Sequence, residues 1–169
     1  QAILVVENYS ADLKVNGDTI CISDGMIDLT QYHAPGTTNG GQFTGTAVMG
    51  DIFDPMMAGE GCHTIWYELA DGVNTCGMST DSMVICVDGS VDASWVPANY
   101  YCEGEVVNLP EGGTWSAPYN TDVQAMLDAN GGLDGINFFN TTNLSNASPV
   151  TLVWSVEGGT CSDTREYLI

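Results

Sequence analysis

Six cysteines are the residues of this 169-residue chain with the most readily interpreted chemistry. An even number suits disulfide bonds in an oxidising compartment, although the count alone leaves many pairings open. Metal binding is the competing chemistry. No two cysteines have Cys-x2-Cys spacing, and His33 and His63 lack a partner at ligand spacing, even though His63 directly follows Cys62. The cysteines therefore predict structural disulfide bonds and no metal site.

The sequence lacks the motifs of nucleophilic and hydrolytic catalysis. It has no Gly-x-Ser-x-Gly, no His-Glu-x-x-His and no Ser/His/Asp constellation. Neither a lysine nor a helix signal follows Gly40-Gly41 or Gly112-Gly113, which favours turns over a phosphate loop. In Phe53-Asp54-Pro55 we expect a core phenylalanine, an aspartate that caps a turn and a proline that ends a strand. The 22 acidic residues inevitably contain carboxylate pairs, but two domains of about 80 residues leave little room for a cleft. We expect no enzymatic activity.

Four tryptophans raise a second kind of chemistry, because aromatic faces stack on sugar rings. Trp115 and Trp154 stand at positions that are also aromatic in the repeat described below, so we expect them in the core. Trp66 and Trp95 have no such counterparts and are the candidate surface aromatics. Packing at a domain junction is the competing interpretation for Trp95.

The charge of the chain restricts its partners. Lys14 and Arg165 are the only basic residues, against 22 acidic ones, which gives a net charge of −20. Nucleic acids and anionic membrane surfaces are bound through Lys and Arg, so both are excluded as partners. The longest apolar run, 2–6, has strand length and is far short of the roughly 20 residues of a membrane span. We expect no cofactor; calcium is the one cation that the acids would attract, and no EF-hand pattern supports it.

The sequence repeats one pattern twice, with a period of about 80 to 87 residues. Each copy has an apolar strand, a cysteine, a second strand, a Gly-Gly-polar-aromatic segment, a glycine followed by an aromatic, and an alternating strand before Thr-Cys. The matching pieces are 3–8 and 83–88, Cys21 and Cys102, 26–29 and 106–109, 40–43 and 112–115, 50–53 and 135–138, 64–69 and 151–156, and 75–76 and 160–161. Two copies predict two domains, 1–86 and 87–169, joined without a flexible linker.

Alternation along the strands predicts which side chains are buried. In 64–69, Ile65, Tyr67 and Leu69 share one face, and Trp66 points to the other. Short alternating strands separated by turns predict an all-β fold of two tandem immunoglobulin-like β-sandwich domains, stapled by disulfide bonds.

One helix is expected in this β-rich chain, over 120–130. Thr121 is its predicted cap, and Asn130-Gly131-Gly132 its end. Val123, Met126 and Leu127 would share its apolar face.

The repeat also predicts the disulfide pairing. Equivalent positions give one bond per domain, Cys21–Cys76 and Cys102–Cys161. A hairpin with residue 70 opposite residue 78 places Cys62 opposite Cys86, which gives a third, cross-strand bond.

Several segments of the first copy resemble a known family, the Ig-like (PKD-like) repeats of very large Bacteroidota surface proteins, including gliding-motility adhesins and extracellular filaments. The segments are 27–29, 40–48, 52–55, 58–61, 63–67 and Thr75-Cys76. The resemblance covers about residues 20–86; residues 87–169 match in outline only, without Phe-Asp-Pro and Ala-Gly-x-Gly, and Cys62 and Cys86 lie outside the family pattern. It implies an exported, non-catalytic module that spaces, stiffens or adheres. It also implies O-glycosylation of Asp-Ser/Thr-hydrophobic tripeptides, which makes Thr19 and Ser82 candidate sites.

Asn-x-Ser/Thr sequons add candidate glycosylation sites for a host with N-glycosylation. These are Asn8, Asn140, Asn143 and Asn146.

The leading functional hypothesis is a structural or adhesive module of a secreted cell-surface protein or filament, with neighbouring repeats, other copies or surface glycans as partners. Strand pairing between subunits would involve apolar terminal segments. The residues concerned are Ile3, Leu4, Val5 and Val6 at one end and Tyr167, Leu168 and Ile169 at the other. The alternative is a carbohydrate-binding module of an exported enzyme, with Trp66 or Trp95 as its platform.

Overall fold

The computed structural model describes residues 3, 9–14, 17–70, 77–98, 101–129, 138–141 and 149–169. The chain divides into two compact units. Unit 1 comprises residues 1–90 and 159–161, and unit 2 comprises 91–158 and 162–169. The division expected after residue 86 falls inside a strand, β7 (Ser79–Asp88), whose last residues belong to unit 1. The return of 159–161 to unit 1 is not anticipated by the sequence pattern.

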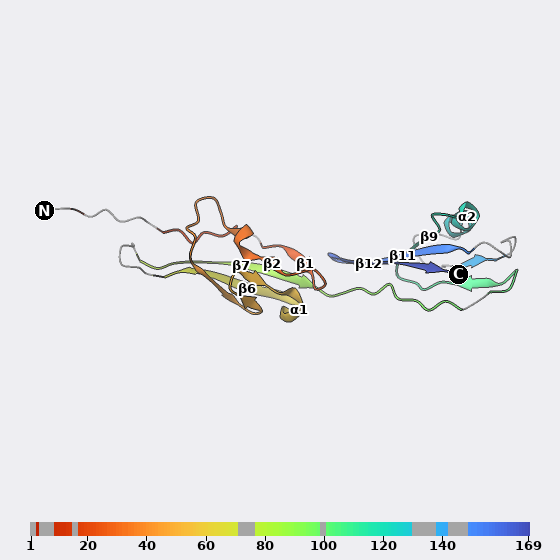
Figure 1. The fold of residues 1–169 in the computed structure, drawn as a ribbon, viewed down its shortest axis with the longest axis horizontal. Coiled ribbons are helices and arrows are strands. Elements are labelled where there is room, and N and C mark those ends of the chain that lie inside the picture. The colour runs from red at the N-terminus through yellow and green to blue at the C-terminus, as the bar shows by residue number, and fades with distance from the viewer. Residues whose placement is uncertain are drawn as a thin grey trace. The chain divides into compact units, whose positions relative to one another are not determined.

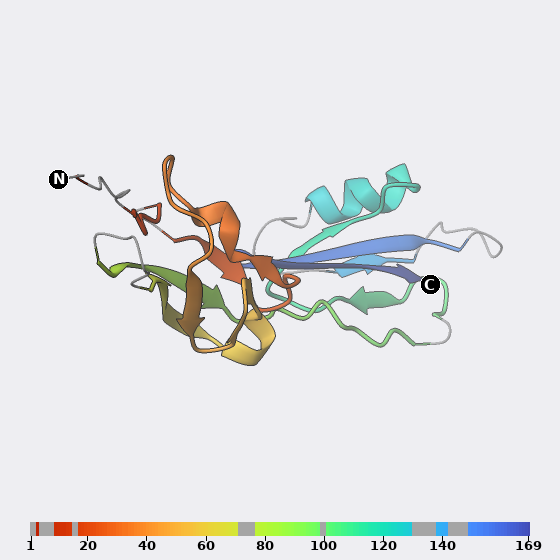
Figure 2. The ribbon, with the colours of Figure 1, turned by 60° about the vertical axis from the view of Figure 1, so that its left-hand side comes forward.

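The described residues of unit 1 form two sheets and one hydrophobic core (Figures 1 and 2). The larger sheet has the order β1-β7-β6-β3, with β1 (Thr19–Cys21) parallel to β7, and β6 (Gly61–Leu69) antiparallel to β7 and to β3 (Gln42–Gly45). The smaller sheet has the order β2-β5-β4, with β2 at Ile27–Asp28, β4 at Val48–Met49 and β5 at Ile52–Phe53. A 3-10 helix, η1 (Leu29–Tyr32), follows β2, and α1 (Pro55–Ala58) follows β5.

The core of unit 1 takes side chains from both sheets. Ile65, Tyr67 and Leu69 of β6 are buried, as their alternation predicts, and Phe53 of the smaller sheet is fully buried in the same cluster. Trp66 lies on the opposite face and is 47% exposed.

Unit 2 is built in the same way. Its larger sheet has the order β12-β11-β9, with β9 at Thr114–Ser116, β11 at Thr151–Gly158 and β12 at Cys161–Leu168. A second pair joins β8 (Val106–Asn108) to β10 (Phe138–Asn140), and a helix, α2 (Thr121–Ala129), follows β9. Strands predominate among the described residues, so the all-β prediction is confirmed at this level. The immunoglobulin-like assignment of each unit stays a prediction.

The strand orders match between the units. In both, the last long strand of the larger sheet pairs with the long strand before it, and that strand pairs with the strand that follows Gly-Gly. In both, the strand after the first cysteine pairs antiparallel with a strand that contains a phenylalanine: β2 with β5, and β8 with β10.

A cross-strand aromatic pair stands at the same place in each unit. Phe43 faces Tyr67 in unit 1, and Trp115 faces Trp154 in unit 2, with ring centroids 4.6 and 5.2 Å apart. Trp115 and Trp154 are 2% and 6% exposed, which confirms that they belong to the core.

The second glycine of each Gly-Gly segment makes room for the aromatic ring. A Cβ atom at Gly41 would lie 2.6 Å from the Tyr67 ring and 2.6 Å from the Glu68 carbonyl oxygen. A Cβ atom at Gly113 would lie 2.4 Å from both Trp154 Nε1 and the Ser155 carbonyl oxygen. The Tyr67 hydroxyl uses this close approach, since it accepts the Gly41 N–H at 2.9 Å. These glycines therefore serve packing.

Helix α2 occupies the predicted span, but its cap differs. The Asn120 side-chain oxygen, and not that of Thr121, accepts the N–H groups of Asp122 and Val123. Asparagine is at least as good an N-cap as threonine, and the helix begins at Thr121, one residue earlier than a Thr121 cap would allow. Val123 and Leu127 are buried, as predicted.

The Phe53-Asp54-Pro55 segment has the structural role expected for it. Asp54 accepts the N–H groups of Met56 and Met57, and Pro55 occupies the first turn of α1, where a missing N–H costs nothing. Phe53 is fully buried.

Replacing Gly41 with alanine should destabilise unit 1 by about 1–3 kcal/mol, because the new methyl group meets backbone as well as the Tyr67 ring. Chemical denaturation followed by fluorescence measures the effect. Gly25→Ala is the matched control, since no atom lies within 4 Å of its added Cβ. Equal stability of the two variants would show that the close approach at Gly41 is absent.

Candidate functional site

The most constrained group of side chains surrounds Asp88 in unit 1. Cys21 of β1 pairs with Asp88 of β7, and the Asp88 carbonyl oxygen accepts the Ile22 N–H at 2.9 Å. The Asp88 carboxylate accepts the Thr160 N–H at 2.8 Å and the Thr160 hydroxyl at 3.0 Å. Asp88 thus holds β1 on one side and the turn between β11 and β12 on the other, so that Cys161 lies beside Cys21.

The two cysteines form a disulfide bond, Cys21–Cys161, with their Cα atoms 4.9 Å apart and a sequence separation of 140 residues. Both are buried, with exposed fractions of 3% and 2%. In the simple entropy model, closing a loop of this length stabilises the folded chain by about 5 kcal/mol.

This bond corrects two of the predicted pairings. Cys21–Cys76 and Cys102–Cys161 are wrong, because Cys21 and Cys161 bond to each other. The Thr-Cys repeat misleads here: Cys161 is the first residue of β12, whereas Cys76 precedes the first residue of β7 by three positions. Cys102 is a free, exposed thiol, and Cys76 lies outside the described residues.

The third predicted pairing is confirmed. Cys62 and Cys86 are directly opposite in the β6–β7 hairpin and form a disulfide bond, with Cα atoms 3.9 Å apart. The predicted hairpin register is thus also confirmed. The bond joins the second residue of β6 to a residue near the end of β7.

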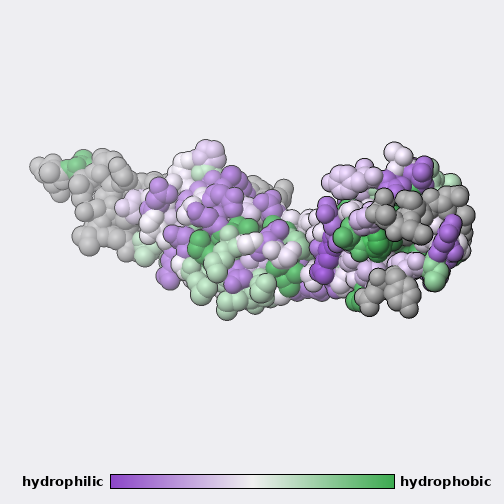
Figure 3. All heavy atoms as spheres, turned by 45° about the vertical axis from the view of Figure 1, so that its right-hand side comes forward, coloured by the Kyte–Doolittle hydropathy of each residue, from purple (hydrophilic) through white to green (hydrophobic). Residues whose placement is uncertain are grey.

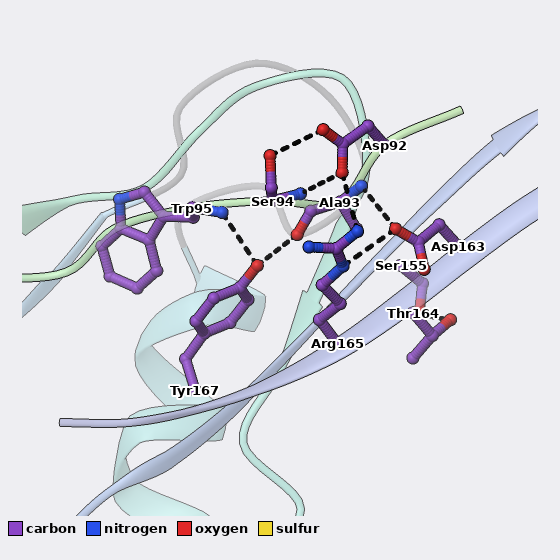
Figure 4. Close-up of polar contacts among 9 residues, drawn as sticks. All are labelled: Asp92, Ala93, Ser94, Trp95, Ser155, Asp163, Thr164, Arg165 and Tyr167. Carbon is purple, nitrogen blue, oxygen red and sulfur yellow. Dashed lines mark hydrogen bonds and ion pairs between the residues drawn. The ribbon is translucent and has the colours of Figure 1, made fainter. Parts of the chain in front are cut away.

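Trp95 lies in an aromatic cluster of unit 2. Its ring packs edge-on against Trp115 and Tyr167, with centroids 5.3 Å apart in both cases. Its backbone N–H donates to the Tyr167 hydroxyl, which in turn donates to the Ala93 carbonyl oxygen (Figure 4). Trp95 is therefore partly buried by packing against residues far from it in the sequence of the same chain.

Arg165 completes the network shown in Figure 4. Its guanidinium group pairs with Asp92 and with Asp163, at 3.0 Å in each case. Asp163 also accepts the Ala93 N–H at 2.9 Å. In unit 1, Asp81 of the equivalent last strand accepts the Leu13 N–H at 2.8 Å. Both units thus use an aspartate of the last long strand to hold the segment that opens the unit.

Three groups have shifted pKa values, each for a structural reason. The hydrogen bond from the Ala93 N–H, aided by the nearby Arg165, lowers the pKa of Asp163. The hydroxyl and N–H of Thr30 lower the pKa of Asp28, which caps η1. Burial, and then the hydrogen bond to the Asp18 carboxylate, raises the pKa of Tyr32.

The histidines have packing roles. His33 stacks on Phe43 and lies 4.6 Å from the centroid of Tyr67, and a ring nitrogen of His63 lies 2.9 Å from the Gly59 carbonyl oxygen. Among the described residues, no group of three or more His, Cys, Asp or Glu side chains could hold a metal ion.

The candidate glycosylation sites fall in different surroundings. Thr19 is exposed on β1, and Ser82 lies directly opposite Trp66 across β6 and β7. Asn140 is the last residue of β10. Asn8, Asn143 and Asn146 lie outside the described residues.

The two terminal segments predicted to pair with other subunits differ in their surroundings. Ile3 is 88% exposed, and Leu4, Val5 and Val6 lie outside the described residues. At the other end, Ile169 exchanges two backbone hydrogen bonds with Val150 of its own unit. The last residues are therefore engaged within the chain on that side, while β12 is an edge strand of its sheet.

No family model, no curated protein and no solved structure matches the chain. No described helix is both long and apolar enough to cross a membrane.

Non-reducing digestion followed by mass spectrometry should yield a peptide pair joined through Cys21 and Cys161, and a second pair joined through Cys62 and Cys86. Thiol labelling before digestion should mark Cys102, which is exposed. A peptide pair joined through Cys21 and Cys76 would contradict the arrangement around Asp88.

The lowered pKa of Asp163 predicts an acid-dependent stability of unit 2. A depressed carboxyl pKa stabilises the fold above the pKa of the unfolded chain, about 3.9, and this contribution is lost as the pH falls through the lower folded value. Asp163→Asn should therefore melt below the wild type at neutral pH, and the difference should close at acid pH.

Thermal melting from neutral pH to below about pH 3 measures this difference. Glu157→Gln, a neighbouring exposed carboxylate on β11, is the control and should run parallel to the wild type. A constant difference between Asp163→Asn and the wild type would contradict the linkage.

Proposed function

We propose that the chain is a non-catalytic structural and adhesive segment of an exported surface protein or extracellular filament. Its main role there is to carry tension. The proposal rests chiefly on the Cys21–Cys161 bond, which closes a covalent loop with a sequence separation of 140. Disulfide bonds form and persist in oxidising compartments, which supports export.

The covalent path explains how the segment would carry tension. A force applied to the two ends enters at residues 1–20, crosses the disulfide bond, and leaves through 162–169. Residues 22–160 lie inside the loop and are bypassed. Hydrogen bonds between residues of 22–160 are then spared while the chain is under load, and only the terminal segments 1–20 and 162–169, the latter including most of β12, bear the force.

The repeated construction also supports a structural role. Each unit uses an aromatic pair, a glycine beneath it and an aspartate of the last long strand to hold itself together. The aspartates at positions 54, 88 and 163 accept hydrogen bonds that hold backbone segments in place, and the histidines pack against neighbouring residues. The net charge of −20 would keep neighbouring fibres apart.

Self-association by strand pairing belongs to the same proposal. In unit 2, β9 and β12 are the two edge strands of the larger sheet and could pair with another subunit.

The alternative function, a carbohydrate-binding module of an exported enzyme, is favoured by one observation, the exposure of Trp66. It differs from the main proposal in requiring a catalytic domain elsewhere in the same polypeptide.

Single-molecule pulling through the two ends tests the tension-bearing role. Of the 168 peptide links in the chain, 140 lie within the loop, so 28 can extend while the bond is intact. The oxidised chain should therefore lengthen to no more than about 100 Å, and the fully reduced chain to about 600 Å.

A Cys21→Ser variant, which keeps the Cys62–Cys86 bond, is the matched control. Its remaining loop removes only 24 links, so it should reach about 500 Å. An oxidised wild-type chain that extends by several hundred ångströms would contradict the tension-bearing role.

A further inference from the structure

The outward face of the larger sheet in unit 1 carries one aromatic residue, Trp66, among mostly polar ones, together with the exposed Val84 opposite Thr64. Alternate residues of β3, β6 and β7 point away from the core. Gln42 pairs with Glu68, and Trp66 pairs with Thr44 on one side and Ser82 on the other. We call these residues, together with Thr64, the Trp66 face: Gln42, Thr44, Thr64, Trp66, Glu68 and Ser82.

Trp66 is the one tryptophan whose ring is outside an aromatic core cluster. It is 47% exposed, while Trp115 and Trp154 are buried and Trp95 packs on Trp115. Thr44 and Ser82, on either side of it, are partly buried although they point outward. Trp66 therefore presents about half of its side chain to solvent between Thr44 and Ser82. Hydrophobic side chains do reach the surface of unit 1 among hydrophilic ones (Figure 3).

The polar groups around the indole remain available to a ligand. No side-chain hydrogen bond described for the chain involves the hydroxyl groups of Thr44, Thr64 or Ser82. Neighbouring side chains on a sheet face stand about 5 Å apart, so these groups form a flat grid around the ring. Strands hold such a grid more rigidly than loops do.

This arrangement has the chemistry of a sugar-binding surface. One face of a pyranose ring presents C–H groups, whose partial positive charge suits the negative face of an indole. The hydroxyl groups at the edge of the sugar then meet hydroxyl, amide and carboxylate partners, which both donate and accept hydrogen bonds.

Charge restricts the sugar. Glu68 is exposed on the Trp66 face, and the only two basic residues of the chain are engaged elsewhere: Lys14 donates to the Gln31 carbonyl oxygen, and Arg165 pairs with Asp92 and Asp163 in unit 2. Uronates, sulfated glycans and other polyanions would meet net repulsion without a compensating cation. We infer that the Trp66 face binds a neutral saccharide, with Trp66 as the stacking platform. This inference rests on the adhesive part of the proposed function and is independent of the tension-bearing part.

The test uses the whole chain, produced without glycosylation so that Ser82 is unmodified. Neutral hexasaccharides of glucose, mannose and xylose are titrated to about 5 mM, beside a polygalacturonate oligosaccharide and a heparin hexasaccharide. At least one neutral hexasaccharide should bind with a dissociation constant of about 1 mM or tighter and change the tryptophan fluorescence, while the anionic ones should not bind.

Two variants separate stacking from folding. Trp66→Ala should weaken binding by about tenfold or more, because a central aromatic contact carries much of the energy of such an interface. Trp66→Phe keeps an aromatic face and should retain most of the affinity. Thermal melting checks that both variants are folded, as expected for an outward side chain.

Several results would overturn the inference. These are the absence of binding to any neutral hexasaccharide, binding that survives Trp66→Ala, or a preference for the anionic glycans. A change of oligomeric state in Trp66→Ala without saccharide binding would assign the face to a second copy of the chain instead. None of these results affects the pulling experiment, so failure of the saccharide site and failure of the tension-bearing role are distinguishable.

Discussion

The register of the β6–β7 hairpin decides what every side chain on its two strands can do. Nine consecutive pairs, from Gly61–Val87 to Leu69–Ser79, fix the alternation. Tyr67 consequently enters the core and Trp66 points outward, while Cys62 meets Cys86. A shift of one residue would exchange the two faces and place Trp66 in the core. The core, the cross-strand disulfide bond and the Trp66 face therefore depend on one alignment.

A second constraint acts at the end of β7, where Asp88 accepts hydrogen bonds from the Ile22 N–H and from Thr160. The carbonyl and carboxylate oxygens of Asp88 thereby hold Ile22 and Thr160 near each other, although these two residues are 138 positions apart in sequence. The Cys21–Cys161 bond then makes this arrangement covalent. Asp88 thus holds the neighbours of both cysteines, Ile22 and Thr160, at the place where the bond forms.

Local patterns in the sequence predict much of this structure. Alternation in β6, the Cys62–Cys86 register, the apolar face of α2 and the cap at Asp54 are each set by residues close in sequence or by one hairpin. The Cys21–Cys161 pairing could not be read in this way. It depends on the Asp88 side chain and on the turn before β12, both far from Cys21 in sequence. The packing of Trp95 could not be read for the same reason, since its partner Tyr167 lies in the last strand.

The scarcity of basic residues has a consequence for resistance to proteolysis. Enzymes that cleave after lysine or arginine find only Lys14 and Arg165 in the chain. Lys14 donates to the Gln31 carbonyl oxygen, and Arg165 is paired with two aspartates. Both side chains would have to leave these partners to enter the active site of a protease. Both residues also lie outside the loop from Cys21 to Cys161. Cleavage at both sites would trim the ends and leave residues 15–165 as one covalent piece.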